Sequence, residues 1–215
     1  MSFLDQAEKD ELVRRIQEAE SRTRGEIVTV IAGQSDGYRY IPLLWSALAA
    51  LAVPGVYFLW LWAASDGWTL ADEPSPAWLY TAQALVFLGL GMLFSLPAIR
   101  LWLIPKSVKF HRAARHAREQ FFLQNLHLTQ GNTGILIFVS VAEHYVEIIV
   151  DRGISEVIDD ALWEETVQEF VGHVRAGNIA TGFYNTIEHC RDILWNHFPA
   201  PDGRPDELPN HLVEV

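Results

Sequence analysis

Two long stretches without a charged residue constrain this chain more than any other feature. They cover residues 41–64 and 77–99. Each is longer than the roughly 20 apolar residues that an α-helix needs to cross the hydrocarbon core of a bilayer. The residues between them are polar and rich in turn-forming types. We therefore predict a hairpin of two transmembrane helices within residues 41–105. The alternative is a pair of buried helices in a soluble core.

The basic residues predict how this hairpin is oriented. The connecting segment 65–76 holds three acidic residues and no Lys or Arg, whereas residues 1–40 and 100–118 carry six basic residues each. Lys and Arg next to a transmembrane helix stay on the cytoplasmic side. We therefore predict an integral protein of the cytoplasmic (inner) membrane with two spans and both termini in the cytoplasm.

Composition narrows the remaining possibilities. The formal net charge of −11 argues against nucleic acid as a partner. About 150 residues remain outside the hairpin, which is enough for one soluble core. Cys190 is the only cysteine, so no intrachain disulfide can form. The first 20 residues are polar and charged, and we expect no cleavable signal peptide.

The residues before the hairpin predict a helix followed by a strand. Ser2 and Asp5 have the spacing of a capping box, and apolar residues then recur at helical spacing from Leu12 to Ala19. Residues 26–32 are rich in β-branched side chains, which favours a buried strand.

The residues after the hairpin predict one helix and then two strands. The helix covers 107–127, and the strands cover 135–139 and 145–150 with a tight turn between them. The side chains expected on the buried stripe of this helix are Phe110, Ala114, Ala117 and Phe121. The two strands are expected to pair as a hairpin.

The last third of the chain predicts two more helices and a tail. Apolar stripes run from Trp163 to Val174 and from Ile179 to Leu194, and Gly177 between them suits a helix C-cap. Residues 199–215 contain repeated prolines, so we expect this tail to be extended or disordered.

A single strand ahead of the hairpin cannot form a domain by itself. The simplest interpretation is one α/β domain with the transmembrane hairpin inserted after its first strand. We predict a mixed β-sheet sandwiched by helices. The predicted parts are 1–40 and 106–198 for the two halves of the domain, 41–105 for the hairpin and 199–215 for the tail.

Four short segments occur in a recognisable order. They are Thr-Arg-Gly-Glu-Ile-Val-Thr-Val at 23–30, Thr-Gly-Ile-Leu-Ile-Phe-Val-Ser at 133–140, Val-Glu-Ile-Ile-Val-Asp-Arg-Gly-Ile at 146–154, and residues 170–183, which include Arg-Ala-Gly at 175–177 and Gly-Phe at 182–183. Together these segments resemble the TPM domain family over nearly all of the soluble part. The resemblance implies a central mixed sheet between helices, an acid phosphatase activity and, in some members, divalent metal binding.

The sequence departs from this family in two respects. Many members carry their membrane anchor after the domain, whereas here the hairpin interrupts it. Many members also have a Gly-aromatic-Gly-Leu-Glu turn after the third strand, followed by an aspartate. Here the turn is Arg-Gly-Ile-Ser-Glu at 152–156, so Glu156 and Asp160 match and Arg152 replaces the first glycine.

The strongest candidate site is the acidic stretch that follows the strand at 145–150. Asp151, Glu156, Asp159 and Asp160 lie between a strand and a helix, where α/β domains often bind ligands. Clustered carboxylates suit Ca²⁺ or Mg²⁺. Alternatively, Asp159 or Asp160 only caps the next helix. Glu26 is either a further carboxylate near this site or a surface residue.

Other residues offer weaker signals. Lys106, Lys109 and Arg112 follow the second span and are candidates for contact with lipid headgroups, or else form a solvated basic face. Cys190 lies on an apolar stripe, which favours packing over nucleophilic chemistry. The chain has neither a phosphate-binding glycine-rich loop nor a Gly-x-Ser-x-Gly elbow, so no catalytic residue is identified.

Two functions follow as hypotheses. In the first, a membrane-anchored TPM-like domain supports the assembly or maintenance of a membrane protein complex; its partners are the lipid bilayer and a membrane protein or a second copy of the chain. In the second, the acidic stretch 151–160 serves a Ca²⁺- or Mg²⁺-assisted acid phosphatase. A transporter subunit would need polar residues along its spans, and residues 41–64 and 77–99 hold few.

Overall fold

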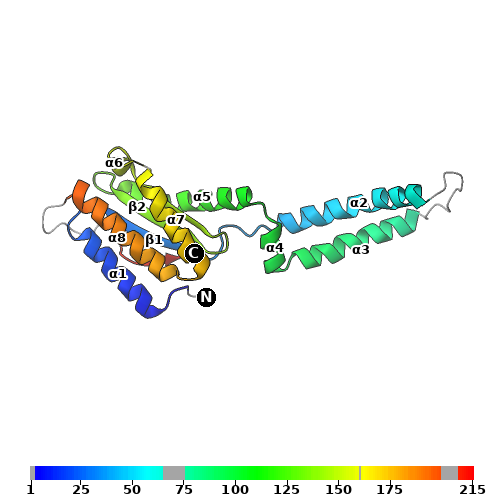
Figure 1. Cartoon of the computed structure of the whole chain (residues 1–215), viewed down its shortest axis with the longest axis horizontal. Coiled ribbons are helices and arrows are strands. Elements are labelled where there is room, and N and C mark those ends of the chain that lie inside the picture. The colour runs from blue at the N-terminus through cyan, green and yellow to red at the C-terminus, as the bar shows by residue number, and fades with distance from the viewer. Residues whose placement is uncertain (1–2, 65–75, 160, 200–207) are drawn as a thin grey trace. The chain divides into compact units, whose positions relative to one another are not determined.

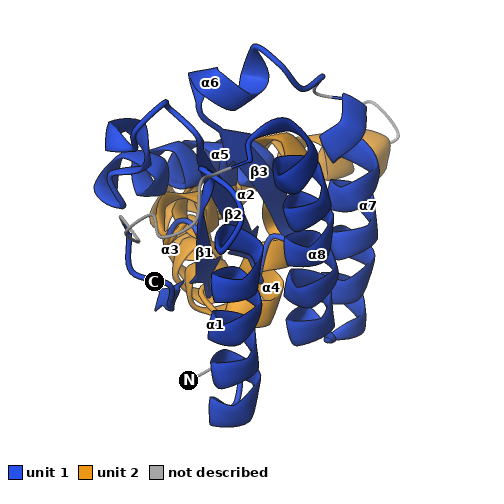
Figure 2. Cartoon of the chain, turned by 90° about the vertical axis from the view of Figure 1, so that its left-hand side faces the viewer, with its two compact units in different colours: residues 1–36, 109–215 blue, residues 37–108 orange. Residues whose placement is uncertain are grey.

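The computed structural model describes residues 3–64, 76–159, 161–199 and 208–215. The chain divides into two compact units (Figures 1 and 2). We call Met1–Asp36 together with Lys109–Val215 the sheet unit, and Gly37–Val108 the hairpin unit. The predicted link 65–76 falls almost entirely outside the described residues.

The described part of the sheet unit contains a mixed sheet in the order β3-β2-β1-β4. The strands are β1 (Glu26–Ala32), β2 (Gly134–Ser140), β3 (Tyr145–Val150) and β4 (Leu212–Glu214). β1 runs parallel to β2 and β4, and β3 runs antiparallel to β2. Because β1 pairs with β2 in register from Glu26 and Gly134 onward, the predicted fold class is confirmed.

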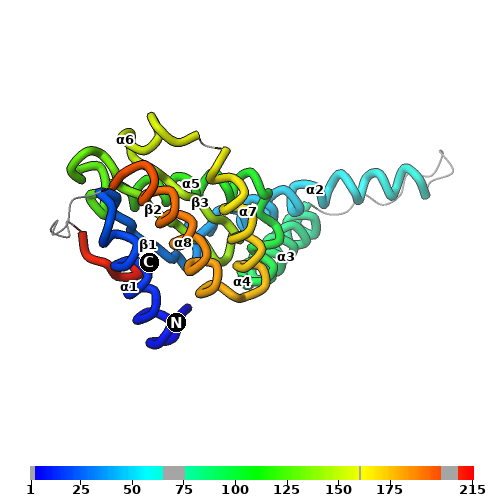
Figure 3. Tube along the Cα trace, turned by 60° about the vertical axis from the view of Figure 1, so that its left-hand side comes forward, coloured from blue at the N-terminus to red at the C-terminus, as the bar shows by residue number. Residues whose placement is uncertain are grey.

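Both faces of the sheet are covered, which explains why β1 and β2 are predominantly apolar and completely buried. Side chains of one face, such as Ile27, Ile31 and Ile137, join a core with α1 (Gln6–Glu20), α7 (Ala161–Ala176) and α8 (Ile179–His197). These helices lie side by side in the order α1, α8, α7 (Figures 2 and 3).

The opposite face is covered by α5 (Lys106–Leu123) and the short helix η1 (Leu126–Leu128). The predicted buried stripe of α5 is partly wrong. The buried residues are Ala113, Ala117, Gln120 and Phe121, whereas Phe110 is exposed. A stripe drawn through apolar residues missed Gln120, whose long side chain packs inward and contacts His116.

The start of α1 also differs from the prediction. Asp5 is the N-cap: its Oδ1 accepts from the Glu8 amide at 2.7 Å, and Glu8 accepts from the Asp5 amide at 2.8 Å. This is a capping box one turn later than predicted. Ser2, its expected first member, lies outside the described residues. The C-cap of α7 is as predicted, because Gly177 has φ +79° and both bonds of a Schellman motif form.

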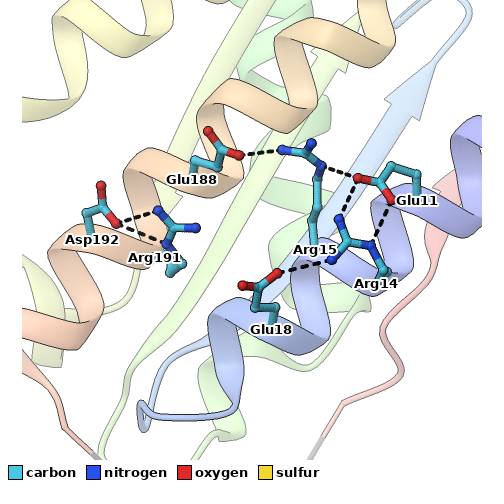
Figure 4. A network of polar contacts seen from close by, with 7 residues as sticks. All are labelled: Glu11, Arg14, Arg15, Glu18, Glu188, Arg191 and Asp192. Atoms are coloured by element: carbon cyan, nitrogen blue, oxygen red, sulfur yellow. Dashed lines mark hydrogen bonds and ion pairs between the residues drawn. The ribbon is translucent and has the colours of Figure 1, made fainter.

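Polar contacts align α1 with α8 above their apolar interface (Figure 4). The Arg15 guanidinium bonds Glu11 on its own helix at 2.6 Å and Glu188 on α8 at 2.5 Å, and it stacks over Tyr184. The Trp195 indole donates to the carbonyl of Ala19 at 2.8 Å. Exposed ion pairs contribute little energy each, so these contacts chiefly fix the register of the two helices.

The C-terminal tail contributes an element that the sequence did not predict. Residues 212–214 form β4, which adds to the free side of β1, and the Val215 amide donates to Ile31 at 2.9 Å. Lys9 of α1 holds this strand through an ion pair with Glu214 at 3.1 Å. Three residues with a strand partner about 180 positions earlier in the chain leave no periodic pattern to recognise.

The hairpin unit contains α2 (Tyr40–Ala64), α3 (Pro76–Phe94) and α4 (Pro97–Leu103). In the described part of the chain, α2 and α3 are the two helices long and apolar enough to cross a membrane. They pack on each other, with Gln83 donating to the carbonyl of Ala50 at 3.2 Å and the rings of Tyr57 and Trp78 5.6 Å apart.

The second apolar run is not one continuous helix to residue 99. Leu96 is extended, with ψ 130°, and the next helix begins at Pro97. A residue before proline avoids the helical region, so the helix is interrupted ahead of Pro97. Pro54, in contrast, lies within an unbroken α2.

Candidate functional site

The acidic stretch begins where β3 ends and where a tight turn leads into α6 (Arg152–Ser155). The Asp151 amide donates to Gly134 at 2.9 Å, and the Gly153 amide donates to Asn132 at 2.9 Å. A Cβ at Gly153 would lie 2.3 Å from the carbonyl oxygen of Gly131, so only glycine fits there. The turn therefore holds the backbone of Asp151 against the end of β2.

Each described acid of this stretch already has a local role. Asp151 Oδ1 caps α6 by accepting from the Arg152 amide at 2.7 Å, and Glu156 forms an exposed ion pair with Arg152 at 2.7 Å. Asp159 Oδ1 accepts from the Ala161 amide at 3.0 Å at the start of α7. The capping alternative thus holds for Asp159, and Asp160 lies outside the described residues.

Two carboxylates nevertheless approach the same end of the sheet. Glu26 is the first residue of β1 and pairs with Gly134 of β2. On the β3 side of the same residue, the Asp151 amide donates to the Gly134 carbonyl. Glu26 is buried, as is Asp151 Oδ2, which has no hydrogen-bond partner among the described residues. Their backbones lie two strand spacings apart, roughly 10 Å, which is too far for a compact ligand set without a third group.

Within the described residues, no three His, Cys, Asp or Glu side chains are grouped so that they could hold a metal ion. Asp151, Glu156 and Asp159 thus do not form a ligand set by themselves. Asp160, the fourth predicted ligand, lies outside the described residues, so the Ca²⁺ or Mg²⁺ site stays a prediction.

A second polar cluster lies at the other end of the sheet, and sequence reasoning missed it. Glu143 is only 4% exposed and accepts from the Ser140 hydroxyl at 2.5 Å and from the Ser35 amide at 3.2 Å. The two serine hydroxyls are 2.7 Å apart. These contacts tie the segment after β1 to the turn between β2 and β3. Small polar residues in turns carry no spacing that would reveal such a cluster.

The basic candidates on α5 differ from one another. Arg112 forms an ion pair with Asp36 at 3.2 Å. Lys106 is exposed and Lys109 half-buried, and neither forms an ion pair with a described residue. Lys106 and Lys109 thus remain the better candidates for headgroup contact. Cys190 is fully buried and packs as predicted, and this burial raises the pKa of its thiol to about 12, which disfavours the reactive thiolate.

A comparison with known protein families tests the resemblance to the TPM domain family. Residues 103–193 match the model of the family described as the TPM domain. This match supports the resemblance over that part of the chain. The matched range includes α5, β2, β3, α7 and most of α8. β1 lies outside this range but pairs along its whole length with β2, so the sheet that contains the matched strands draws on residues before and after the hairpin in the sequence.

A solved structure shows the same fold. The chain is similar to the NMR structure of BA42 protein from the psychrophilic bacterium Bizionia argentinensis, with a TM-score of 0.59 and 19% sequence identity. The similarity covers 100% of this chain and 97% of that one. No curated protein matches the sequence.

Proposed function

We propose that this protein is a TPM domain held at the cytoplasmic face of the inner membrane by α2 and α3, where it supports the assembly or maintenance of a membrane protein complex. The supporting observation is the exposure of the hairpin unit's apolar side chains. Among the described residues of α3 none is buried, and Met92 is 80% exposed. Such a surface is unfavourable in water and needs lipid or another protein to cover it.

The sheet unit has no such need. Apolar cores lie on both faces of its sheet. The membrane anchor therefore fixes where the domain lies and is not needed to stabilise its fold. β1 ends at Ala32 and α2 begins at Tyr40, so the tether between sheet and span is short. A short tether raises the effective concentration of the domain for any partner in the same membrane. This favours a partner that is itself a membrane protein, or a second copy of the chain.

The test is photo-crosslinking in native membranes. A photoreactive residue at Met92 or at exposed Leu51 should give a reproducible partner band. The same residue at Phe183, which is buried in the sheet unit, is the matched control and should give none. Capture of lipid alone at both hairpin positions would contradict the assembly role.

A metal-assisted phosphatase is the second candidate, and one observation supports it. Asp151 Oδ2 is buried and has no hydrogen-bond partner among the described residues. Asp151 also directly precedes the turn whose acids match the family pattern. Calorimetric titration with Ca²⁺ and Mg²⁺ tests it, together with hydrolysis of a model phosphate ester. Asp160→Asn should abolish both signals, whereas Asp192→Asn, on the exposed surface of α8, should change neither. Equal signals in both variants would exclude this site.

A further inference from the structure

The charged residues in the described part of the hairpin unit lie at one end of it. Arg39 directly precedes α2, and Arg100 and Lys106 follow α3, whereas the described residues of this unit include no Asp or Glu. Arg39 and Lys106 are exposed, and neither forms an ion pair with a described residue. The excess of negative charge, −11 over the whole chain, lies in the sheet unit. This end of the hairpin unit therefore has a positive potential that no acidic side chain in its described residues neutralises.

Two helices begin at this end, and their dipoles add to the same positive potential. α2 begins at Tyr40, directly after Arg39, and α5 begins at Lys106. The N-terminus of a helix carries a partial positive charge, which an acidic residue in the first turn stabilises. Neither α2 nor α5 has an acidic residue in its first turn. Basic residues at two neighbouring helix N-termini therefore favour an anion that comes from outside the described chain.

A small apolar core holds the two helix starts together. Tyr38 is 1% exposed and packs with Ile41 and Ile104, and Val108 of α5 lies against the same cluster. Tyr38 has a left-handed backbone, with φ 48°, which is rare for a bulky residue and persists only where packing maintains it. The packing of these neighbours therefore fixes the backbone at Arg39 and at Lys106 before any anion binds.

An exposed tryptophan belongs to the same end of the hairpin unit. α4 turns away from the axis of α3 after the interruption at Pro97 (Figure 1). Leu101 and Leu103 of α4 pack against the small core, whereas Trp102 between them is 83% exposed. Tryptophan prefers the headgroup region of a bilayer, because its ring is apolar and its N–H is polar. An exposed Trp102 therefore favours a ligand with an apolar part as well as a charge.

We propose that Arg39, Trp102 and Lys106 form a binding site for an anionic phospholipid. The two cations bind the phosphate of the headgroup, and the Trp102 ring packs on the acyl chains next to the glycerol. A phospholipid fits better than free phosphate, because a single ligand then matches both the positive charge and the exposed apolar ring. The inference rests on the proposed function, since it needs α2 and α3 to lie in a bilayer.

The test measures lipid affinity by native mass spectrometry on the full chain in an uncharged detergent. Phosphatidylglycerol is the anionic probe, and phosphatidylcholine is the probe without net charge. The chain should bind phosphatidylglycerol roughly tenfold or more tightly, because each basic residue near an anionic headgroup strengthens binding roughly fivefold. Arg39→Gln together with Lys106→Gln should reduce this preference to less than about twofold. An absent preference, or one that survives the double substitution, would overturn the proposal.

The matched control removes the same charge elsewhere, through Arg24→Gln together with Arg152→Gln. Both residues are exposed, and they lie at the end of the sheet where β1 and β2 begin, whereas the chain leads into α2 from the opposite end of β1. This variant should keep the preference for phosphatidylglycerol. Loss of the preference in the control would show a general effect of net charge and would contradict the site.

Two further measurements test the apolar part of the site. Trp102→Ala should weaken the binding of both lipids by a similar factor, because the ring contributes packing and not charge. Unchanged binding of both lipids would contradict the role of the ring. Phosphatidylglycerol should raise the melting temperature of the chain, whereas inorganic phosphate should not. An equal rise with inorganic phosphate would make free phosphate the ligand and overturn the assignment to a lipid.

Failure of this site can be distinguished from failure of the assembly role. If membrane crosslinking captures a partner and the preference for phosphatidylglycerol is absent, the lipid site fails and the assembly role stands. If the preference depends on Arg39 and Lys106 but only lipid is captured at Met92 and Leu51, the assembly role fails and the lipid site stands.

Discussion

The two units of this chain are both rich in apolar residues but place them in opposite ways. In the sheet unit, every residue of β1 and β2 is buried between layers of helices. In the hairpin unit, α2 buries four residues and the described residues of α3 bury none. An apolar run therefore does not by itself define a core. The layer that covers it does, and for α2 and α3 the covering layer is not within the described chain.

The largest expected effect contrasts a buried and an exposed aromatic residue. Phe183 packs against Phe170 with ring centroids 4.9 Å apart, so Phe183→Ala should lower the free energy of unfolding by about 3–5 kcal/mol. Trp62 in α2 is 76% exposed, and Trp62→Ala should change the free energy of unfolding by less than about 1 kcal/mol. Denaturant unfolding in detergent measures both. Similar losses would mean that Trp62 is covered by protein.

A new charge should disfavour membrane insertion of the hairpin unit but should have little effect in the sheet unit. Leu59→Arg places a cation on the exposed surface of α2 and should disfavour membrane insertion by roughly 2.5–3.5 kcal/mol. Val157→Arg, at an exposed position of the sheet unit, should have little effect on folding or membrane targeting. The fraction of protein in the membrane pellet reports the difference. Full insertion of the Leu59 variant would argue against a bilayer around α2.

Packing density should distinguish two glycines. Gly153→Ala forces a Cβ against main-chain oxygens and should destabilise the sheet unit by about 1–3 kcal/mol. At Gly55 in α2, no described atom lies within 4 Å of an added Cβ. Gly55→Ala should therefore be neutral or stabilise by up to about 1 kcal/mol. Thermal melting resolves the two, and a loss at Gly55 would reveal close packing of another helix against α2.

The smallest effect concerns a half-buried acid of the sheet unit. Burial raises the pKa of Glu147, while the Tyr145 hydroxyl and the Arg118 charge act in the opposite direction. A raised folded-state pKa means that the folded protein holds the proton more tightly, so the Glu147 contribution becomes less favourable as pH rises through that pKa. Glu147→Gln should then stabilise the protein at pH 7 and have little effect at pH 3. An equal change at both values would contradict this origin.

Much of the sheet unit could be predicted because its residues obey simple periodicities. The β1 and β2 runs, the stripes of α7 and α8, and Gly177 as a C-cap follow directly from residue spacing. The features that were missed depend on tertiary contacts. Gln120 is buried without being apolar, and the cluster of Ser35, Ser140 and Glu143 is assembled from segments about 105 positions apart.

The candidate site was predicted less well than the fold. A run of acids can serve as metal ligands or as helix caps, and sequence spacing does not distinguish these roles. The structure assigns Asp151 and Asp159 to caps and Glu156 to an ion pair. Conversely, no sequence motif predicts that β3 lies at an edge of the sheet, because an edge strand is defined by the pairing partner that it lacks.

The central claim is that the hairpin interrupts one domain, so both flanks of the hairpin lie on the same side of the membrane. Single cysteines at Ser21, Ser75 and Ser155 in a Cys190→Ser background test it directly, with a membrane-impermeant thiol reagent added to intact cells and then to opened cells. We predict that only the cysteine at position 75 is labelled in intact cells, and that those at 21 and 155 react together after opening. Labelling of 21 and 155 from opposite sides would contradict the account.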